Sequence, residues 1–203
     1  MRNWSVILPL VLIFSSSGWA QDRPAPAAKK QFPLEASFIN HAVTMPFDGI
    51  VLKPIHPGFN LGTEYVYRQG RRVRFYQSLQ AGYYYNKYNA KALFFMTGPG
   101  LRYTFPFGLF ADAGLGVGYL HSFHPTEIFA QDASGEYVRV KDTGKPAFVF
   151  FGSLGLGWDF SARIGWPICL FIRYQPYIQT PYNPTSSIFP QALVHFGVRV
   201  QLW

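Results

Sequence analysis

The sequence predicts an all-β protein, a transmembrane antiparallel up-and-down β-barrel with eight strands. Hydrophobic residues make up 49% of the chain and charged residues only 14%, whereas a soluble domain carries about 25% charged residues. Past the N-terminal segment, the chain shows no long apolar helix-like stretch. It holds instead a series of segments in which apolar and polar residues alternate. A closed barrel of such strands satisfies every backbone hydrogen bond inside a membrane.

The first residues predict an export signal. Arg2 supplies a positive charge, residues 6–14 form a short apolar run, and small residues lead to Ala20. This order is typical of a cleaved signal peptide at residues 1–20. Residues 21–35 are rich in proline, alanine and charge, so we expect a disordered periplasmic linker there. The barrel is then assigned to residues 36–203.

Seven segments alternate with the period of two that places successive side chains on opposite faces of a strand. They are residues 58–68, 73–85, 92–105, 109–123, 147–160, 169–179 and 192–203. One face of each is apolar, and the other mixes glycine with one or two charges. Such a mixed face is a poor soluble surface. We therefore expect the apolar face to contact lipid and the mixed face to line the lumen.

Glycines on the mixed face have a role in this arrangement. A narrow eight-stranded barrel is filled by its own side chains. The bulky lumen residues need glycine neighbours to fit. These bulky residues are Tyr76, Phe94, Phe110 and Phe171.

The lengths of the links give the orientation and the number of strands. Short links follow residues 58–68, 92–105 and 147–160, and short turns face the periplasm in such barrels. The segment 58–68 therefore runs toward the periplasm, and one more strand must precede it, between residues 36 and 51. The longest link, residues 124–146, is expected to form an extracellular hairpin around the turn-forming residues 132–135.

With these features the chain resembles the small eight-stranded outer-membrane β-barrel proteins of Gram-negative bacteria. The resemblance covers about residues 36–203 and includes the closing strand VHFGVRVQLW, which ends in the aromatic Trp203. It implies a place in the outer membrane after signal cleavage, and recognition of the last strand by the barrel-insertion machinery. These motifs are architectural and specify no activity.

The lumen face carries both acidic and basic residues, and buried charges must be paired. We expect an ion-pair network that fills the closed lumen. Its predicted members are Glu64, Arg68, Arg74, Arg102, Asp112, Asp159, Arg173 and Arg199.

The segment LHSFHPTE offers a catalytic alternative. His121 as base, Ser122 as nucleophile and Glu127 as orienting acid would make a lipid A deacylase-like hydrolase. Adjacent residues of a strand point to opposite faces, however, which separates His121 from Ser122. We therefore expect a non-enzymatic barrel, acting as a membrane-structural, surface-binding or complex-subunit protein, with a lipid-modifying hydrolase as the alternative. No cofactor and no metal site are expected.

The formal net charge of +8 points to an anionic partner. An exported protein has little access to nucleic acid, so lipid headgroups and lipopolysaccharide are the expected partners, alongside a possible outer-membrane protein complex. A basic surface rim would contact the phosphates of lipopolysaccharide. Its predicted members are Lys87, Lys91, Arg139, Lys141 and Lys145.

The three-part N-terminus makes a direct prediction. N-terminal sequencing of the protein purified from membranes should begin at Gln21, because cleavage after Ala20 removes the signal. A mature protein that retains Met1 would contradict it.

Overall fold

The computed structural model describes residues 32–45, 54–132, 134–161, 165–182 and 186–202. Within these ranges, no helix is long and apolar enough to span a bilayer. The predicted signal peptide, residues 21–31 of the predicted linker and the terminal Trp203 lie outside the described residues.

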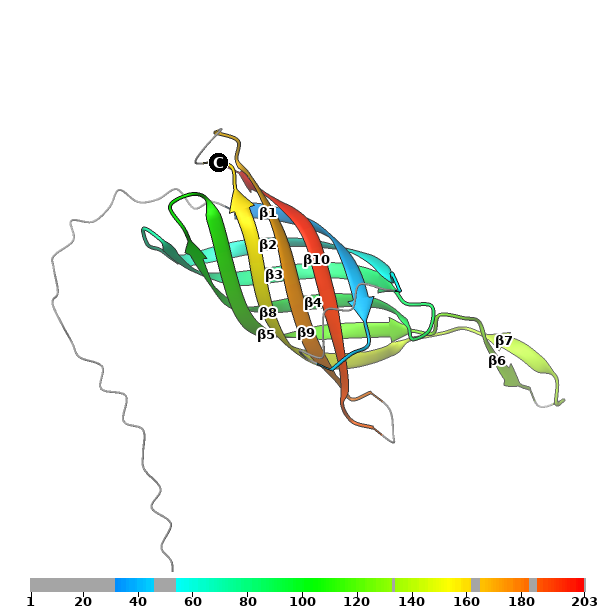
Figure 1. Cartoon of the computed structure of the whole chain (residues 1–203). Coiled ribbons are helices and arrows are strands. Elements are labelled where there is room, and N and C mark those ends of the chain that lie inside the picture. Colours follow the sequence, from blue (N-terminus) through cyan, green and yellow to red (C-terminus); the bar gives the residue numbers. More distant parts are fainter. Residues whose placement is uncertain (1–31, 46–53, 133, 162–164, 183–185, 203) are drawn as a thin grey trace, which may run out of the picture.

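Eight strands close into one antiparallel barrel (Figure 1). They are β1 (Phe32–Ala42), β2 (Pro57–Gln69), β3 (Val73–Tyr85), β4 (Lys91–Thr104), β5 (Leu109–Phe123), β8 (Lys145–Asp159), β9 (Ile168–Thr180) and β10 (Phe189–Leu202). Each strand pairs with its neighbour along the barrel chain, and β1 closes the ring against β10. A separate two-stranded sheet joins β6 (Ile128–Gln131) to β7 (Tyr137–Val140). The predicted fold class and number of strands are confirmed.

The first strand differs from the prediction. It was expected within residues 36–51, but β1 occupies Phe32–Ala42. Residues 32–35 of the predicted linker are therefore strand. The alternation begins there, since Leu34 and Phe38 are exposed on the outer wall while Glu35 is buried in the lumen.

The two faces of the wall are opposite in character. On β5, the side chain of Leu115 is 71% exposed on the outside, whereas Asp112 is 5% exposed inside. Exposed large apolar residues recur at alternate positions on seven of the barrel strands; on β10 only Phe196 is strongly exposed, and the adjacent Leu193 and Val194 are both buried. The lumen holds most of the buried polar and charged residues. This inversion of a soluble barrel is the pattern of a transmembrane one.

Glycines make room for the large rings of the lumen, as the sequence predicted. Each ring lies against a glycine of the neighbouring strand. The pairs are Tyr76 with Gly100, Phe94 with Gly82, Phe110 with Gly157, and Phe171 with Gly197. A Cβ atom at Gly197 would stand 2.3 Å from Phe171 Cζ, so no larger residue fits unless the ring moves.

The ends of the barrel are unequal (Figure 1). The link between β2 and β3, the link between β4 and β5, and the final residues of β10 lie at one end, which we term the turn end. The β6–β7 hairpin projects from the opposite end, which we term the loop end. Strands β6 and β7 flank the predicted turn at residues 132–135.

The face assignment can be tested at Leu115. Leu115→Arg would place a charge on the lipid-facing wall and should cost about 2–4 kcal/mol of unfolding free energy if it lies near the bilayer midplane. Urea titration of the protein in lipid vesicles measures this cost. Leu115→Met, which keeps an apolar side chain, is the control and should remain close to the native protein. A neutral Leu115→Arg would mean that this face does not contact lipid.

Candidate functional site

Six charged side chains form a closed ring in the lumen toward the turn end, which we term the charge ring. Acid and base alternate around it, and every member has a side chain no more than 5% exposed. The members are Glu35 on β1, Glu64 on β2, Arg102 on β4, Asp112 on β5, Arg173 on β9 and Arg199 on β10. Three positive and three negative formal charges cancel.

Glu35 and Arg199 join the two strands at which the barrel closes. The Glu35 carboxylate accepts two hydrogen bonds from Arg173, at 2.7 and 3.0 Å. Arg199 Nη2 lies 2.8 Å from Glu35 and 2.8 Å from Glu64, so it bridges the two acids. Such charge-assisted, two-pronged contacts are the strongest that a guanidinium makes.

The other half of the ring is built on Arg102. Its guanidinium donates two hydrogen bonds to Glu64, at 2.6 and 3.0 Å, and a third to Asp112 at 3.3 Å. The ring closes where Arg173 Nε lies 3.9 Å from Asp112. Because acids and arginines alternate around the ring, removing one member leaves a buried charge of the opposite sign without one of its partners.

Aromatic rings pack against the guanidinium groups. The Arg102 guanidinium lies 4.9 Å from the centres of both Tyr76 and Phe110. That of Arg173 lies 4.8 Å from the centre of Phe171. The glycine-supported rings therefore also hold the charge ring in place, since the face of an aromatic ring attracts a guanidinium.

A polar layer lies on the loop-end side of the charge ring. Asn60 donates to the Ser37 hydroxyl at 3.3 Å, and this hydroxyl lies 3.1 Å from His195 Nδ1. Gln175 reaches across from β9 to the Met96 sulfur on β4, at 3.0 Å. Side chains thus fill the middle of the lumen as well.

A third cluster fills the lumen near the loop end. His41 stacks on Tyr84 with ring centres 4.0 Å apart, and its Nε2 lies 2.7 Å from the Gln191 side-chain oxygen. The hydroxyls of Tyr84 and Tyr177 are 2.9 Å apart. All four side chains are 0–1% exposed. Charged, polar and aromatic layers follow one another along the barrel axis.

Arg68 is not a member of the charge ring. Strict alternation from Glu64 would place it in the lumen, but a register shift between Val66 and Arg68 interrupts the β2–β3 pairing. After this bulge Arg68 pairs with the outward-facing Phe75, and its side chain is exposed. An extra residue in one strand re-aims every side chain that follows it.

Arg74 and Asp159 were also predicted in the network and lie outside it. Both are half-buried. Arg74 donates to the Gln69 side chain, and Asp159 accepts the backbone N–H of Ser161 at 2.8 Å. Among the described residues, neither forms an ion pair.

Glu35 is the member that the sequence analysis missed, because it assigned this residue to the linker. A signal was available. The predicted network held five arginines and three acids, an excess of buried positive charge that required another acid. Glu35 alternates with Leu34 and Ala36 in the manner of a lumen residue.

The three residues of the hydrolase alternative are not brought together. His121 contacts the Tyr119 hydroxyl at 2.8 Å and the Thr143 carbonyl at 3.0 Å. Ser122 donates to the carbonyl of Lys145, and Glu127 pairs with Arg139 at 3.1 Å. Nor do the described residues contain a group of three or more His, Cys, Asp or Glu placed to hold a metal ion.

The predicted basic rim lies at the loop end. Lys91 and Lys145 pair with Phe123 and Ser122, so they flank the last residues of β5. Lys87, Lys141 and Lys145 are exposed. Ion pairing in the described part of the chain occupies Arg139 but none of these four lysines.

Two aspartates outside the barrel order the hairpin. Asp142 accepts backbone N–H groups of Gly144 at 2.9 Å and His124 at 2.6 Å, which lowers the pKa of its carboxyl. At the tip, hydrogen bonds from the Ser134 hydroxyl and from the backbone lower the pKa of Asp132. A lowered pKa means that these contacts stabilise the fold above the ordinary Asp pKa and are lost as the pH falls below it.

The charge ring can be tested at Glu64. Glu64→Gln would leave three buried arginines facing two acids and should cost about 3–5 kcal/mol. Glu127→Gln is the control, because that exposed pair is worth about 0–1 kcal/mol. Urea titration of both variants gives the comparison. The double variant Glu64→Gln/Arg102→Gln restores the balance of charge and should recover part of the loss; equal costs for the two single variants would refute the ring's role.

No protein-family model and no curated protein sequence matches this chain. Solved structures do. The crystal structure of Neisserial surface protein A is similar with a TM-score of 0.53 and 12% identity, over 84% of this chain and 97% of that one. Ail, the attachment invasion locus protein of Yersinia pestis, is similar with a TM-score of 0.51 and 11% identity, over 86% of this chain and 100% of that one. At such identities the likeness is one of fold, and the chain has the closed eight-stranded fold of small outer-membrane barrel proteins.

Proposed function

We propose that this chain is a non-enzymatic outer-membrane protein of a Gram-negative bacterium, whose barrel anchors a surface-binding loop end. The observation that supports this proposal is the contrast between the lumen and the rim. The lumen is filled and its charge ring is neutral, whereas the rim keeps lysines that no described acid neutralises. The lysines at the loop end are therefore available to bind an anionic partner.

The orientation of the barrel supports the same proposal. Short turns face the periplasm and long loops face the exterior in barrels of this kind. The turn end would then lie at the periplasm, and the hairpin would project from the cell. Residues 1–20 would deliver the chain to the export machinery, and the apolar outer face of β10 would present the closing strand to the barrel-insertion machinery.

Lipopolysaccharide is the proposed partner. In the proposed orientation its phosphates would lie near the loop end, where β4 begins at Lys91 and β8 begins at Lys145. Lysine binds phosphate as a point charge, without demanding a fixed geometry. The hairpin adds exposed apolar side chains, Phe129 and Tyr137, which extend the contact surface beyond the lysines.

A triple variant tests the rim. In Lys87→Gln/Lys91→Gln/Lys145→Gln, affinity for lipopolysaccharide micelles should fall about fivefold for each charge removed, from about 1 kcal/mol per basic residue near an anionic surface. Flotation assays at two salt concentrations measure it, and the native protein should lose affinity more steeply with salt. The control is Lys87→Arg/Lys91→Arg/Lys145→Arg, which keeps the positive charge of the rim and should bind as the native protein does. Unchanged affinity of the lysine variant would contradict the proposal.

The hairpin is expected to be dispensable for folding. Replacing residues 125–141 by a short Gly/Ser link leaves every barrel pair and Asp142 in place, and closure entropy varies slowly with loop length. The variant should unfold at the same urea concentration as the native protein. In intact cells, protease should cut first within residues 132–135, at the exposed tip. Cleavage at residues 70–72 in intact cells would invert the orientation.

A further inference from the structure

The link between β2 and β3 is the most basic short segment of the chain. Arg71 and Arg72 lie in this link, and Arg68 lies just before it, near the end of β2. All three side chains are exposed, and we term these residues the arginine turn. None of the three forms an ion pair with a carboxylate in the described part of the protein. The arginine turn therefore presents three free cationic groups at the turn end of the barrel.

These groups are directed to the outer wall rather than into the lumen. The bulge in β2 sets Arg68 opposite Phe75, a side chain that is 42% exposed on the lipid-facing surface. Arg72 Nη1 lies 3.5 Å from the Tyr103 hydroxyl on the same wall. Without the bulge, alternation would have turned Arg68 toward the lumen. The arginines consequently lie at the edge of the apolar band, at the level of the lipid headgroups in a bilayer.

A hollow of about 580 Å³ lies directly beneath the arginine turn. Its lining is cationic at one side and apolar at the other. The lining residues are Arg68, Gly70, Arg71, Arg72, Val73, Phe75 and Leu101. Such a lining matches an amphipathic molecule with a negative head.

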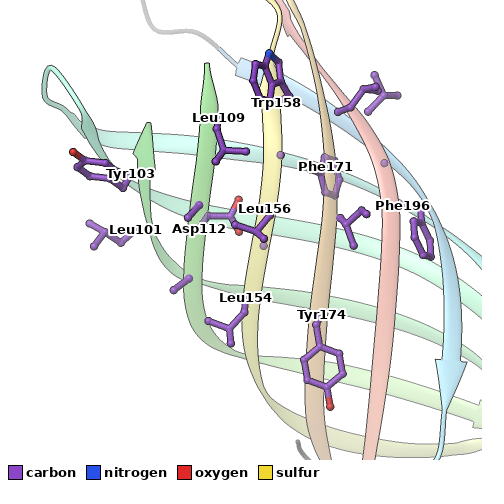
Figure 2. A pocket seen from close by; sticks show the side chains of 18 of the residues that line it. Leu101, Tyr103, Leu109, Asp112, Leu154, Leu156, Trp158, Phe171, Tyr174 and Phe196 are labelled. Carbon is purple, nitrogen blue, oxygen red and sulfur yellow. The ribbon is translucent and has the colours of Figure 1, made fainter. Parts of the chain in front are cut away.

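The apolar side of this hollow continues along the outer wall. Phe75 and Leu101 also border a second hollow of about 390 Å³, which includes Ala113 and Leu154. A third, of about 1260 Å³, shares Leu101, Ala113 and Leu154 with the second. Figure 2 shows this third hollow, with Trp158 near the turn end and Tyr174 farther toward the loop end.

Small outward residues create the depression. Ala111 and Ala113 on β5 take outward positions between larger neighbours, and Gly152 on β8 pairs with Leu115. In a bilayer, the acyl chains of lipids contact the outer wall of the barrel. They can fill a depression between protruding leucines. The hollow beneath the arginine turn and this depression share Leu101 in their linings.

We infer that the turn end binds an anionic glycerophospholipid. Its phosphate contacts Arg68, Arg71 and Arg72, because guanidinium groups bind phosphate oxygens in pairs. Its acyl chains lie over Leu101, Ala113 and Leu154. A free phosphate would use the arginines but not the apolar hollow, so the lipid accounts for both. This site is at the opposite end of the barrel from the proposed lipopolysaccharide rim and does not depend on it.

The experiment compares lipids retained by the full mature chain. The protein is refolded in vesicles of phosphatidylcholine with one fifth phosphatidylglycerol, and native mass spectrometry counts the lipids that remain bound. Phosphatidylglycerol should be enriched at least fivefold among them relative to the vesicle. In Arg68→Gln/Arg71→Gln/Arg72→Gln this enrichment should disappear, while the heat-modifiable migration of the folded barrel stays unchanged.

Two controls separate the alternatives. In Lys87→Gln/Lys91→Gln/Lys145→Gln the enrichment should fall less than in the arginine variant, because those lysines lie at the loop end, away from the hollow bordered by Phe75 and Leu101. Ala113→Phe fills the hollow with an apolar ring and should lower the number of retained lipids without altering the fold of the barrel. Equal retention of both lipids by the native protein, or loss of enrichment only in the lysine variant, would overturn the inference. Inorganic phosphate that displaces no phosphatidylglycerol supports a lipid site; complete displacement by phosphate at millimolar concentration would show that the arginines bind a free anion.

Discussion

The closed pairing of three acids with three arginines in the lumen is the interaction on which the rest of this structure depends. Each charge is removed from water inside a narrow barrel, at a cost of several kcal/mol per ion. Complete alternation around the wall offsets that cost and links six of the eight barrel strands. Because Glu35 and Arg199 lie on β1 and β10, the same ring bridges the strands at which the barrel closes. The residues that balance the charge of the lumen are thus also residues that hold the first and last strands together.

The charge ring in turn requires the glycine and aromatic pattern. Guanidinium groups of this size need flat neighbours, and the rings of Phe110 and Phe171 provide them. Those rings fit because Gly157 and Gly197 stand beside them on adjacent strands. With the polar and aromatic layers farther along, side chains occupy the lumen at three levels. A barrel filled in this way leaves its outer wall and its two ends as the surfaces that can contact other molecules.

The two ends differ in how they use positive charge. At the loop end, lysines on long side chains surround the mouth, and an ordered hairpin rises from it. At the turn end, a bulge in β2 sets Arg68 on the outer wall, where Arg72 contacts the Tyr103 hydroxyl. The flexible lysine side chain can bind phosphates in many positions, whereas the planar guanidinium of arginine binds a phosphate in a defined geometry. The bulge therefore matters more for the outside of the barrel than for its core.

The sequence by itself determined the fold class, the lipid-facing side of each strand and the hairpin, because these depend on period-two alternation and on turn residues that are local along the chain. The bounds of β3 and β5 followed from the same pattern. The orientation of the links required an eighth strand at the start of the barrel, although residues 36–51 alternate only weakly. Only the tertiary structure decided where β1 begins, which charges pair, and that Arg68 leaves the lumen. Ion pairing across a barrel joins residues as far apart as Glu35 and Arg199, so it depends on strand order and register together. A bulge inserts one residue without a distinctive sequence mark, and that single insertion reverses the face of every side chain after it.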